Sequence, residues 1–423
     1  MAIARAMLRC ESMRVISHND ADGITSAGII CNALHRAGIP FHATLVGRLD
    51  PTVVEDLEGP VVFCDMGSGQ PDLVSRVPGD VFVVDHHRPV GTLSCMSINP
   101  HQVGIDGAFE MSASGTAYAV ARQMGENVDL SGLALVGAMG DRQAMIGANR
   151  AILEEAVLGG AVEVRPGLKM EDGDAQDVFE QAIEPLLDIT GDTVKVREFL
   201  EGIGVSGKLQ SISNAQLSRL STALVLKMLM QGSFAADSIV GEVIRLRCEV
   251  VENAAEMVTM LNACGKLDTP GLGLTLCLRD EFAIGGCRKA SQEYRRWILD
   301  EVNVLKGGCQ ELKNIRYLLA EDMVAGGVVA GLGIRYLFSD RPLLVLNKFE
   351  GKVKISARGN KLLVSQGLDL SLALRESAGA VGGAGGGHSV ASGAAIPLGK
   401  EDSFLAQVDQ MVGEQLGRSR AER

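Results

Sequence analysis

Residues 15–23 of the chain read VISHNDADG, in which an apolar run typical of a buried β-strand ends abruptly in His18, Asp20 and Asp22. Side chains of these two types bind divalent metal ions. An aspartate after a strand is also typical of a turn or a helix N-cap, so the segment by itself fits either a solvated turn or half of an active site. The rest of the chain decides between the two.

The first 145 residues alternate short apolar runs with helical patterns. The expected helices cover residues 23–38, 115–124 and 130–140, and the expected strands are MRVIS (13–17), FHATLVG (41–47), PVVFCD (60–65) and DVFVVDHH (80–87). Short apolar strands separated by helices predict an α/β fold with a parallel sheet that is covered by helices on both faces.

Acidic and histidine side chains follow three of these strands. Asp65 comes after the third strand, Asp85, His86 and His87 come after the fourth, and Asp141 ends the helical segment GAMGDRQ (137–143). In parallel sheets the ligand site lies beyond the carboxyl ends of the strands, so we expect these groups to meet His18, Asp20 and Asp22 at one rim. Four carboxylates and two imidazoles can hold two divalent ions with mixed oxygen and nitrogen coordination, which suits manganese. Two such ions can clamp the oxygens of an in-line phosphoryl displacement.

Composition limits the class of protein. The 423 residues are enough for two or three domains, and the net charge of −12 argues against a protein that coats nucleic acid by bulk electrostatics. Nine cysteines stand singly without a CxxC pair, which predicts reduced thiols in a cytoplasm. Charges in the first 17 residues argue against a signal peptide, and the uncharged stretch 377–399 is too rich in Gly, Ala and Ser for a membrane span.

The chain is expected to have three segments: a catalytic core (1–145), a mainly helical continuation and connector (146–325), and a smaller α/β substrate-binding domain (326–423). The run EVIRLRCEVVENAAEMVTMLNACG (242–265) belongs to the helical segment by its apolar spacing. The runs GVVAGLGIRYLF (327–338), PLLVLNKF (342–349) and GKVKISARG (351–359) begin a β-rich unit.

Two features of the last segment suggest that it binds phosphate groups. In GKVKISARG, basic or polar residues that include Lys354 and Arg358 alternate with apolar ones, which gives a strand one basic face, although gatekeeper lysines on an exposed edge show the same pattern. In GGAGGGH (382–388), glycines such as Gly386 and Gly387 would let backbone N–H groups approach a phosphate, with a flexible linker as the alternative. We expect a phosphate-cradling loop in which His388 and Arg358 hold the nucleic-acid strand that is cut.

The motifs SHNDADG, VFCDMG, VVDHH and GAMGD resemble, in order and spacing, the four motifs of the DHH phosphoesterase superfamily. The segments KISARG and GGAGGGHSVASGAAIP resemble the DHH-associated C-terminal domain. The HxDxD spacing is similar to that of RecJ-like nucleases rather than to the longer spacing of the family's inorganic pyrophosphatases. INPHQVGIDGAFEMSASG and NAAEMVTMLNACGKLD look most like archaeal RecJ-like proteins, some of which associate with the replication GINS complex or with a repair helicase.

The resemblance implies a role for each site residue. His18 and Asp20 would bind one Mn²⁺, the residues Asp22, His86 and Asp141 would bind the other, and Asp65 would bridge both, with Mg²⁺ as an alternative metal. His87 would lie near the phosphate as an electrostatic or proton-donating group, and Asp85 would orient a neighbouring histidine.

The implied activity is that of a Mn²⁺-dependent exonuclease that cuts single-stranded DNA or RNA into mononucleotides by attack of hydroxide, in a narrow cleft between the two domains. Two alternatives stay open. One is a phosphodiesterase for short oligonucleotides or cyclic dinucleotides, or a phosphatase for 3′-phosphoadenosine phosphate. The other is a replisome or helicase scaffold without catalysis.

Overall fold

The computed structural model describes residues 2–233, 235–236, 239–349 and 351–421. The chain forms two compact units, and each is built from two separate stretches: Met1–Glu171 with Glu242–Tyr294, and Asp172–Gly241 with Arg295–Arg423. The expected segment boundaries at residues 145 and 325 stay a prediction.

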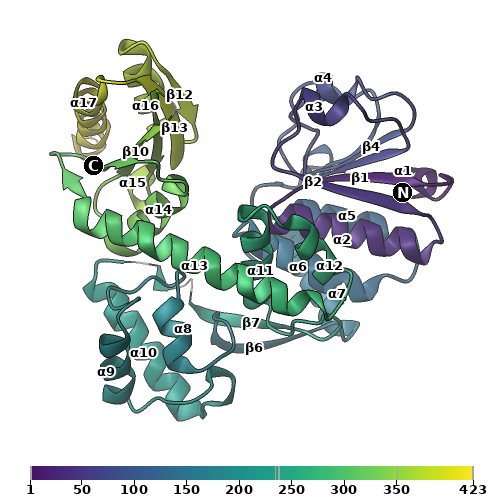
Figure 1. Cartoon of the computed structure of the whole chain (residues 1–423), viewed down its shortest axis with the longest axis horizontal. Coiled ribbons are helices and arrows are strands. Elements are labelled where there is room, and N and C mark those ends of the chain that lie inside the picture. The colour runs from purple at the N-terminus through teal and green to yellow at the C-terminus, as the bar shows by residue number, and fades with distance from the viewer. Residues whose placement is uncertain (1, 234, 237–238, 350, 422–423) are drawn as a thin grey trace. The chain divides into compact units, whose positions relative to one another are not determined.

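The first unit is centred on a five-stranded parallel sheet with the order β2-β1-β3-β4-β5 (Figure 1). Its strands are β1 (Met13–His18), β2 (Phe41–Val46), β3 (Val61–Cys64), β4 (Val81–Val84) and β5 (Met96–Ile98). The four strands expected from the apolar runs are all present. The short β5 was not expected, because three residues with an exposed Met96 carry little strand signal.

Both faces of this sheet are covered, as a parallel sheet requires. Helix α2 (Ala21–Arg36) packs along the sheet and against α5 (Ala113–Ala121) and α6 (Ser131–Gly140), whereas α3 (Pro51–Val54) and α4 (Pro71–Val74) lie on the opposite face (Figure 1). On that face, Val54 and Val74 pack into an apolar cluster with Phe63 and Val83. The expected α/β class is confirmed.

The remaining elements of the first unit surround this core. They are α1 (Ala2–Met7), the 3₁₀ turns Pro100–Val103 and Val128–Leu130, α7 (Gly147–Leu158), β6 (Val162–Leu168), β7 (Val240–Leu246), α11 (Ala254–Lys266), α12 (Pro270–Cys277) and the start of α13 (Ala283–Gly308). Helices α11 and α12 pack against α2, and the approach of α12 is so close that a Cβ at Gly28 would lie 2.6 Å from the Cβ of Cys277.

The helical prediction for residues 242–265 is wrong in its first part. Residues 240–246 form β7, which pairs with β6, and α11 begins only after Asn253. Ile244 and Leu246 are buried at alternate positions, which is the spacing of a strand. The Asn253 side chain then accepts hydrogen bonds from the N–H groups of Ala255 and Glu256 and so caps the new helix.

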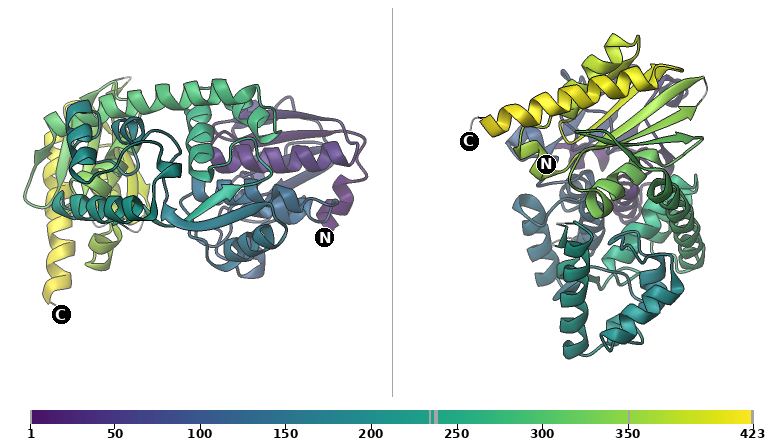
Figure 2. Two further views of the ribbon diagram at one scale, coloured as in Figure 1. Left: turned by 90° about the horizontal axis from the view of Figure 1, so that it is seen from below. Right: turned by 90° about the vertical axis from the view of Figure 1, so that its left-hand side faces the viewer.

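The second unit combines helices with a six-stranded mixed sheet of order β12-β13-β11-β10-β9-β8. Its strands are β8 (Gln310–Glu311), β9 (Arg316–Glu321), β10 (Leu343–Phe349), β11 (Lys352–Arg358), β12 (Ala384–Gly387) and β13 (Ala391–Pro397). Its helices are α8 (Ala175–Gln181), α9 (Thr193–Gly202), the 3₁₀ turn Leu209–Ser211, α10 (Asn214–Met230), α14 (Gly326–Leu332), α15 (Lys361–Ser365), α16 (Leu370–Ala380) and α17 (Glu401–Ala421), together with the end of α13. Helix α16 packs on β12 and β13, and α17 packs on α16 (Figure 2).

The β-rich prediction is wrong for residues 327–338. Most of this run lies in α14 and in the π-helical turn Gly333–Leu337 that follows it. A short apolar run fits a buried helix as well as a strand, and here Gly326 allows close packing because its Cβ would lie 3.2 Å from Val345 of β10. No helix in the described part of the chain combines the length and the apolar character needed to cross a membrane.

Candidate metal centre

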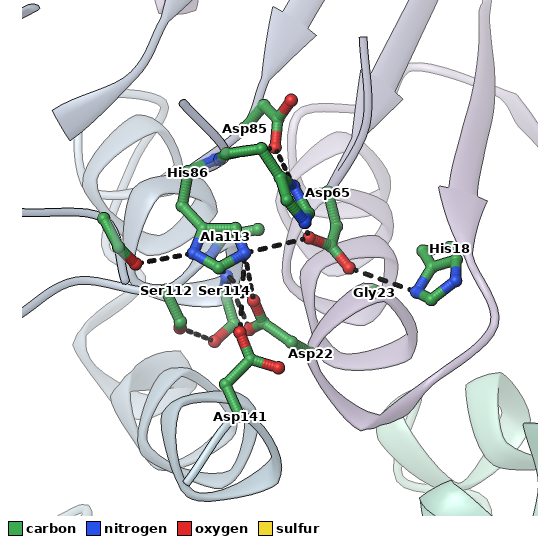
Figure 3. Close-up of polar contacts among 12 residues, drawn as sticks. His18, Asp22, Gly23, Asp65, Asp85, His86, Ser112, Ala113, Ser114 and Asp141 are labelled. Carbon is green, nitrogen blue, oxygen red and sulfur yellow. Dashed lines mark hydrogen bonds and ion pairs between the residues drawn. The ribbon is translucent and has the colours of Figure 1, made fainter. Parts of the chain in front are cut away.

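The predicted rim exists, and it gathers side chains from four parts of the first unit (Figure 3). His18 ends β1, Asp65 follows β3, the pair His86 and His87 follows β4, and Asp141 lies at the C-terminal end of α6. Three overlapping groups have potential ligand atoms within 4.8 Å of one another: His18, Asp20 and Asp65; Asp22, His86 and Asp141; and Asp65, His86 and His87. The structure therefore brings together all six residues that were predicted as ligands.

Asp22 is completely buried in the first turn of α2 and is held by the start of another helix. Its carboxylate accepts hydrogen bonds from the backbone N–H groups of Ala113 (2.7 Å) and Ser114 (2.9 Å), which open α5. The positive end of the α5 dipole stabilises this buried charge. Gly137 of α6 completes the enclosure, because a Cβ there would lie 2.4 Å from Asp22 Oδ1.

Asp65 lies between His18 and His86. Its backbone has a left-handed φ of 57°, a conformation that aspartate tolerates better than most side chains. One carboxylate oxygen, Oδ2, is 3.5 Å from His18 Nδ1, and the other, Oδ1, is 3.3 Å from His86 Nε2. Oδ1 is buried and accepts no hydrogen bond within the described structure. A buried oxygen of this kind is the type of atom that a cation satisfies.

Backbone carbonyls orient the rings of His18 and His86. His86 Nδ1 is 2.7 Å from the carbonyl oxygen of Gly107, so Nε2 points to the carboxylates, 3.4 Å from Asp141. His18 Nε2 is 3.2 Å from the Gly47 carbonyl, which leaves Nδ1 to face Asp20 at 2.9 Å. A carbonyl that fixes the ring orientation in this way is typical of histidines that bind metals.

The site concentrates negative charge. Burial opposes protonation of His86, but the carboxylates of Asp65, Asp22 and Asp141 outweigh burial and raise its pKa to about 11. Burial and the neighbouring carboxylates raise the pKa of both Asp22 and Asp141 above the usual range. These carboxyl groups are therefore costly to keep ionised without a compensating positive charge. The donor set of carboxylates and imidazoles fits divalent cations such as Mn²⁺ or Mg²⁺.

Asp85 lies outside these three groups but contacts the pair His86 and His87. It is fully buried and accepts hydrogen bonds from the N–H groups of Ser68 (2.8 Å), His86 (2.7 Å) and His87 (3.1 Å). Its Oδ1 also lies 2.8 Å from His87 Nδ1. Burial opposes ionisation of Asp85, but these bonds hold its pKa below the usual range. Asp85 thus orients His87, whose side chain is 57% exposed at the rim.

Several groups of the centre were missed from the sequence. The carbonyls of Gly47 and Gly107 leave no pattern, because any residue carries the same group. The start of α5 could have been found, since Ser112 precedes it and caps it by accepting from the Gly115 N–H group. Asn262, which accepts a hydrogen bond from the Ala21 N–H group, lies in a segment that carried the family resemblance, but the sequence did not indicate its contact with the site.

The four predicted substrate-binding residues lie in the second unit. Arg358 ends β11 and pairs with Ala391 of β13, and the His388 N–H group donates to the Ala391 carbonyl at 2.9 Å. The turn that carries the exposed His388 is thus next to the strand end that carries Arg358. Along β11, Val353, Ile355 and Ala357 are buried and the lysines are exposed, which confirms the predicted alternation.

The glycine-rich stretch is an edge strand rather than the predicted loop. Residues 384–387, which include Gly386 and Gly387, form β12 and pair antiparallel with β13. Part of the glycine content serves packing, because a Cβ at Gly385 would lie 2.8 Å from the Leu374 carbonyl of α16. Gly386 differs, since a Cβ there would have no atom of the described residues within 4 Å.

Two family models match the chain: the DHH family, N-terminal domain, over residues 12–138, and the DHHA1 domain over residues 339–414. An uncharacterized protein of Methanocaldococcus jannaschii is 33% identical over 423 residues, covering 96% of this chain and 94% of that protein. The chain belongs to the DHH phosphoesterase superfamily.

Solved structures show that this DHH protein has the fold of RecJ. RecJ from Thermus thermophilus in complex with Mn²⁺ matches with a TM-score of 0.61 and 19% identity over 98% of this chain. The match covers 54% of that protein, so this chain spans about half its length. CDC45 from Entamoeba histolytica matches with a TM-score of 0.63 and 13% identity over 97% of both chains.

Proposed function

We propose that this DHH protein is a Mn²⁺-dependent phosphodiesterase that acts as an exonuclease on single-stranded DNA or RNA and releases mononucleotides. The observation that carries the proposal is the convergence of six ligand-type side chains, spread over residues 18–141, into groups no wider than 4.8 Å. The shared fold with RecJ, which was solved with manganese, supports both the chemistry and the metal.

In the proposed arrangement, His18 and Asp20 would hold one cation, and Asp22, His86 and Asp141 would hold the other. Asp65, whose two carboxylate oxygens face His18 and His86, would serve both. When bound, the two cations supply the Lewis acidity that activates the attacking water and stabilises charge on the phosphoryl oxygens. The chain itself holds these ligands in place before substrate arrives, through the α5 N–H groups and the carbonyls of Gly47 and Gly107.

His87 is proposed to interact with the phosphate group of the substrate. Its Nδ1 is held by Asp85, and this contact raises the pKa of His87 above its usual value. The protonated ring is therefore favoured relative to that of an ordinary histidine, and Nε2 is the nitrogen left to donate to a phosphoryl or leaving-group oxygen. Its partial exposure at the rim fits a group that meets substrate rather than one that is sealed in the core.

The second unit is proposed to hold the nucleic-acid backbone. On one face of its sheet, Lys354 pairs with Ala395, Ser356 pairs with Gly393, and Arg358 pairs with Ala391. Cations next to small residues let a phosphate chain approach the sheet closely, and we include Gly386, Gly387 and His388 at the edge of this surface. Such a local surface is needed because the whole chain carries a net charge of −12.

The decisive assay uses end-labelled single-stranded DNA and RNA, labelled at either end, with Mn²⁺, Mg²⁺ or EDTA. We expect Mn²⁺-dependent release of mononucleotides, and we expect Asp65→Ala and His87→Ala to abolish it while the circular dichroism spectrum stays unchanged. Full activity in both variants would reject the site. A length series from dimers upward separates the exonuclease from an enzyme that accepts only very short oligonucleotides.

Absence of cleavage by folded protein with bound Mn²⁺ would instead favour the scaffold alternative. A GINS-type replication complex or a repair helicase is the proposed partner class, as the sequence resemblance implies. Co-purification of tagged protein from its native cells tests this part separately, and recovery of neither partner would reject it.

A further inference from the structure

A helix far along the chain contacts the loop that carries the first three ligands. Helix α11 (254–266) lies outside the segment that matches the DHH model, yet its Asn262 Oδ1 accepts a hydrogen bond from the Ala21 N–H group at 3.1 Å. In return, the Asn19 side-chain amide donates to the Gly265 carbonyl at 3.3 Å. The two contacts join the N-terminus of α2 to the C-terminus of α11.

Each contact satisfies a group that its own helix leaves open. The first N–H groups of a helix and its last carbonyls have no partner within the helix. Ala21 is the first residue of α2, and Asp20 already caps the Gly23 N–H group at 3.0 Å, so Asn262 supplies the partner that Ala21 lacks. Gly265 is next to the last residue of α11, and Asn19 supplies the donor for its carbonyl. Opposite ends of two helix dipoles also meet here, which is favourable.

The contact leaves the loop no room to move towards α11. A Cβ at Gly265 would lie 1.8 Å from the Asn19 carbonyl oxygen. Movement towards α6 is limited as well, because a Cβ at Gly140, the residue before Asp141, would lie 2.7 Å from the Ala21 Cβ. The peptide between Asp20 and Asp22 is therefore held from both sides.

We propose that Asn262 is a positioning residue of the metal centre, which fixes the Ala21 peptide and thereby the separation of the ligands Asp20 and Asp22. The inference rests on the proposed function only in that both need the metal centre. Asp20 shows how tightly the geometry is set: Oδ1 is occupied by the Gly23 N–H group, and Oδ2 faces His18 at 2.9 Å. If the loop lost its contact with α11, Asp20 Oδ2 would turn away from His18. Loss of groups that orient metal ligands typically lowers metal affinity about 10–100-fold.

The test is titration of metal-stripped full-length protein with Mn²⁺ by calorimetry, without nucleic acid. Asn262→Ala should weaken Mn²⁺ binding by about 10–100-fold. Asn262→Asp keeps the acceptor oxygen and should bind Mn²⁺ more tightly than Asn262→Ala. Thr259→Ala is the matched control, because Thr259 lies on the same helix but its hydroxyl donates to the Ala255 carbonyl within that helix. Its Mn²⁺ affinity should equal that of the wild type.

A merely structural role predicts a different result. Asn262→Ala and Thr259→Ala would then lower the unfolding midpoint of the metal-free protein alike and would bind Mn²⁺ alike, which would overturn the proposal. If Asn262→Ala does not fold, Asn19→Ala removes the reciprocal bond from the loop side, and unchanged Mn²⁺ affinity in that variant would also overturn it. Wild-type protein that binds Mn²⁺ but cuts no nucleic acid would reject the proposed function and leave this inference standing.

Discussion

The substitution Gly137→Ala adds one methyl group at a crowded point beside Asp22 of the metal centre. The new Cβ would lie 2.1 Å from Ser114 Oγ, 2.4 Å from Asp22 Oδ1 and 2.5 Å from Thr25 Oγ1, whereas ordinary contacts begin near 3.4 Å. For the Asp22 oxygen alone, the required displacement is 3.4 − 2.4 = 1.0 Å. That shift would break or strain the bonds from Ala113 and Ser114, which are 2.7 and 2.9 Å long.

The expected cost follows from three contributions. Overpacking in a core costs about 1–3 kcal/mol. Weakening hydrogen bonds to a buried carboxylate costs about 1.5–3 kcal/mol. Replacing a glycine within a helix by alanine raises the free energy of unfolding by about 1 kcal/mol, which offsets part of this loss. We therefore expect Gly137→Ala to lower the free energy of unfolding by about 1.5–5 kcal/mol, a large part of the stability of a typical domain. We also expect the displaced Asp22 to weaken Mn²⁺ binding.

The assay is urea denaturation of metal-free protein together with Mn²⁺ titration. Gly285→Ala is the control, because Gly285 lies in α13 and, in the part of the chain that the structure describes, no atom would lie within 4 Å of a Cβ there. That variant should be as stable as the wild type or more stable by up to about 1 kcal/mol. If Gly137→Ala matches Gly285→Ala in stability and in Mn²⁺ affinity, the enclosure of Asp22 is looser than described and the reasoning fails.

Three further predictions concern the metal, an ion pair and the second unit. Mn²⁺ at 100 times its dissociation constant should stabilise the fold by about 2.7 kcal/mol, measured by thermal shift and reversed by EDTA; an unchanged midpoint would contradict the site. Burial opposes ionisation of Asp129, but Arg36 and Arg279 hold its pKa at about 2, below the 3.8 of an unperturbed aspartate. Its contribution to the free energy of unfolding is therefore present above pH 4 and is lost as the pH falls through 2. Asp129→Asn should lower the free energy of unfolding by about 0.5–2 kcal/mol at pH 7 in urea denaturation, and the difference from the wild type should disappear below pH 2. Arg358→Ala should raise KM for oligonucleotides and leave Mn²⁺ affinity unchanged; altered metal binding would contradict its assignment to substrate.

The strand ends that form the site were accessible to sequence analysis. Each strand of the parallel sheet that contributes a ligand is an apolar run that stops at an acidic or histidine residue, and parallel strands place their carboxyl ends on one rim. His18, Asp65 and His86 could therefore be brought together on paper from the alternation of strands and helices alone.

Other features depend on contacts that no local pattern contains. Residues 327–338 carry the apolar character of a strand, but packing against β10 favours a helix there. The glycine run 384–387 has no side-chain alternation to mark it as a strand, and its pairing with β13 decides its conformation. Asn262 is 241 residues from its partner Ala21, and one asparagine on a helix looks like any other until the fold brings it to a helix end.

The position of Asp22 affects how catalytic activity can be inferred for other proteins of this family from their sequences. Its carboxylate supports two amides at the start of α5 as well as facing the metal centre. A relative without catalytic activity would still need an acidic residue at that position to accept the hydrogen bonds from the start of α5. An acidic residue there is therefore weak evidence that a relative is an active enzyme. Asp141 caps no backbone N–H group in the part of the chain described and faces His86 across the rim. In a relative that has lost catalysis, we therefore expect Asp141 to be replaced before Asp22, and its replacement is the more informative sign.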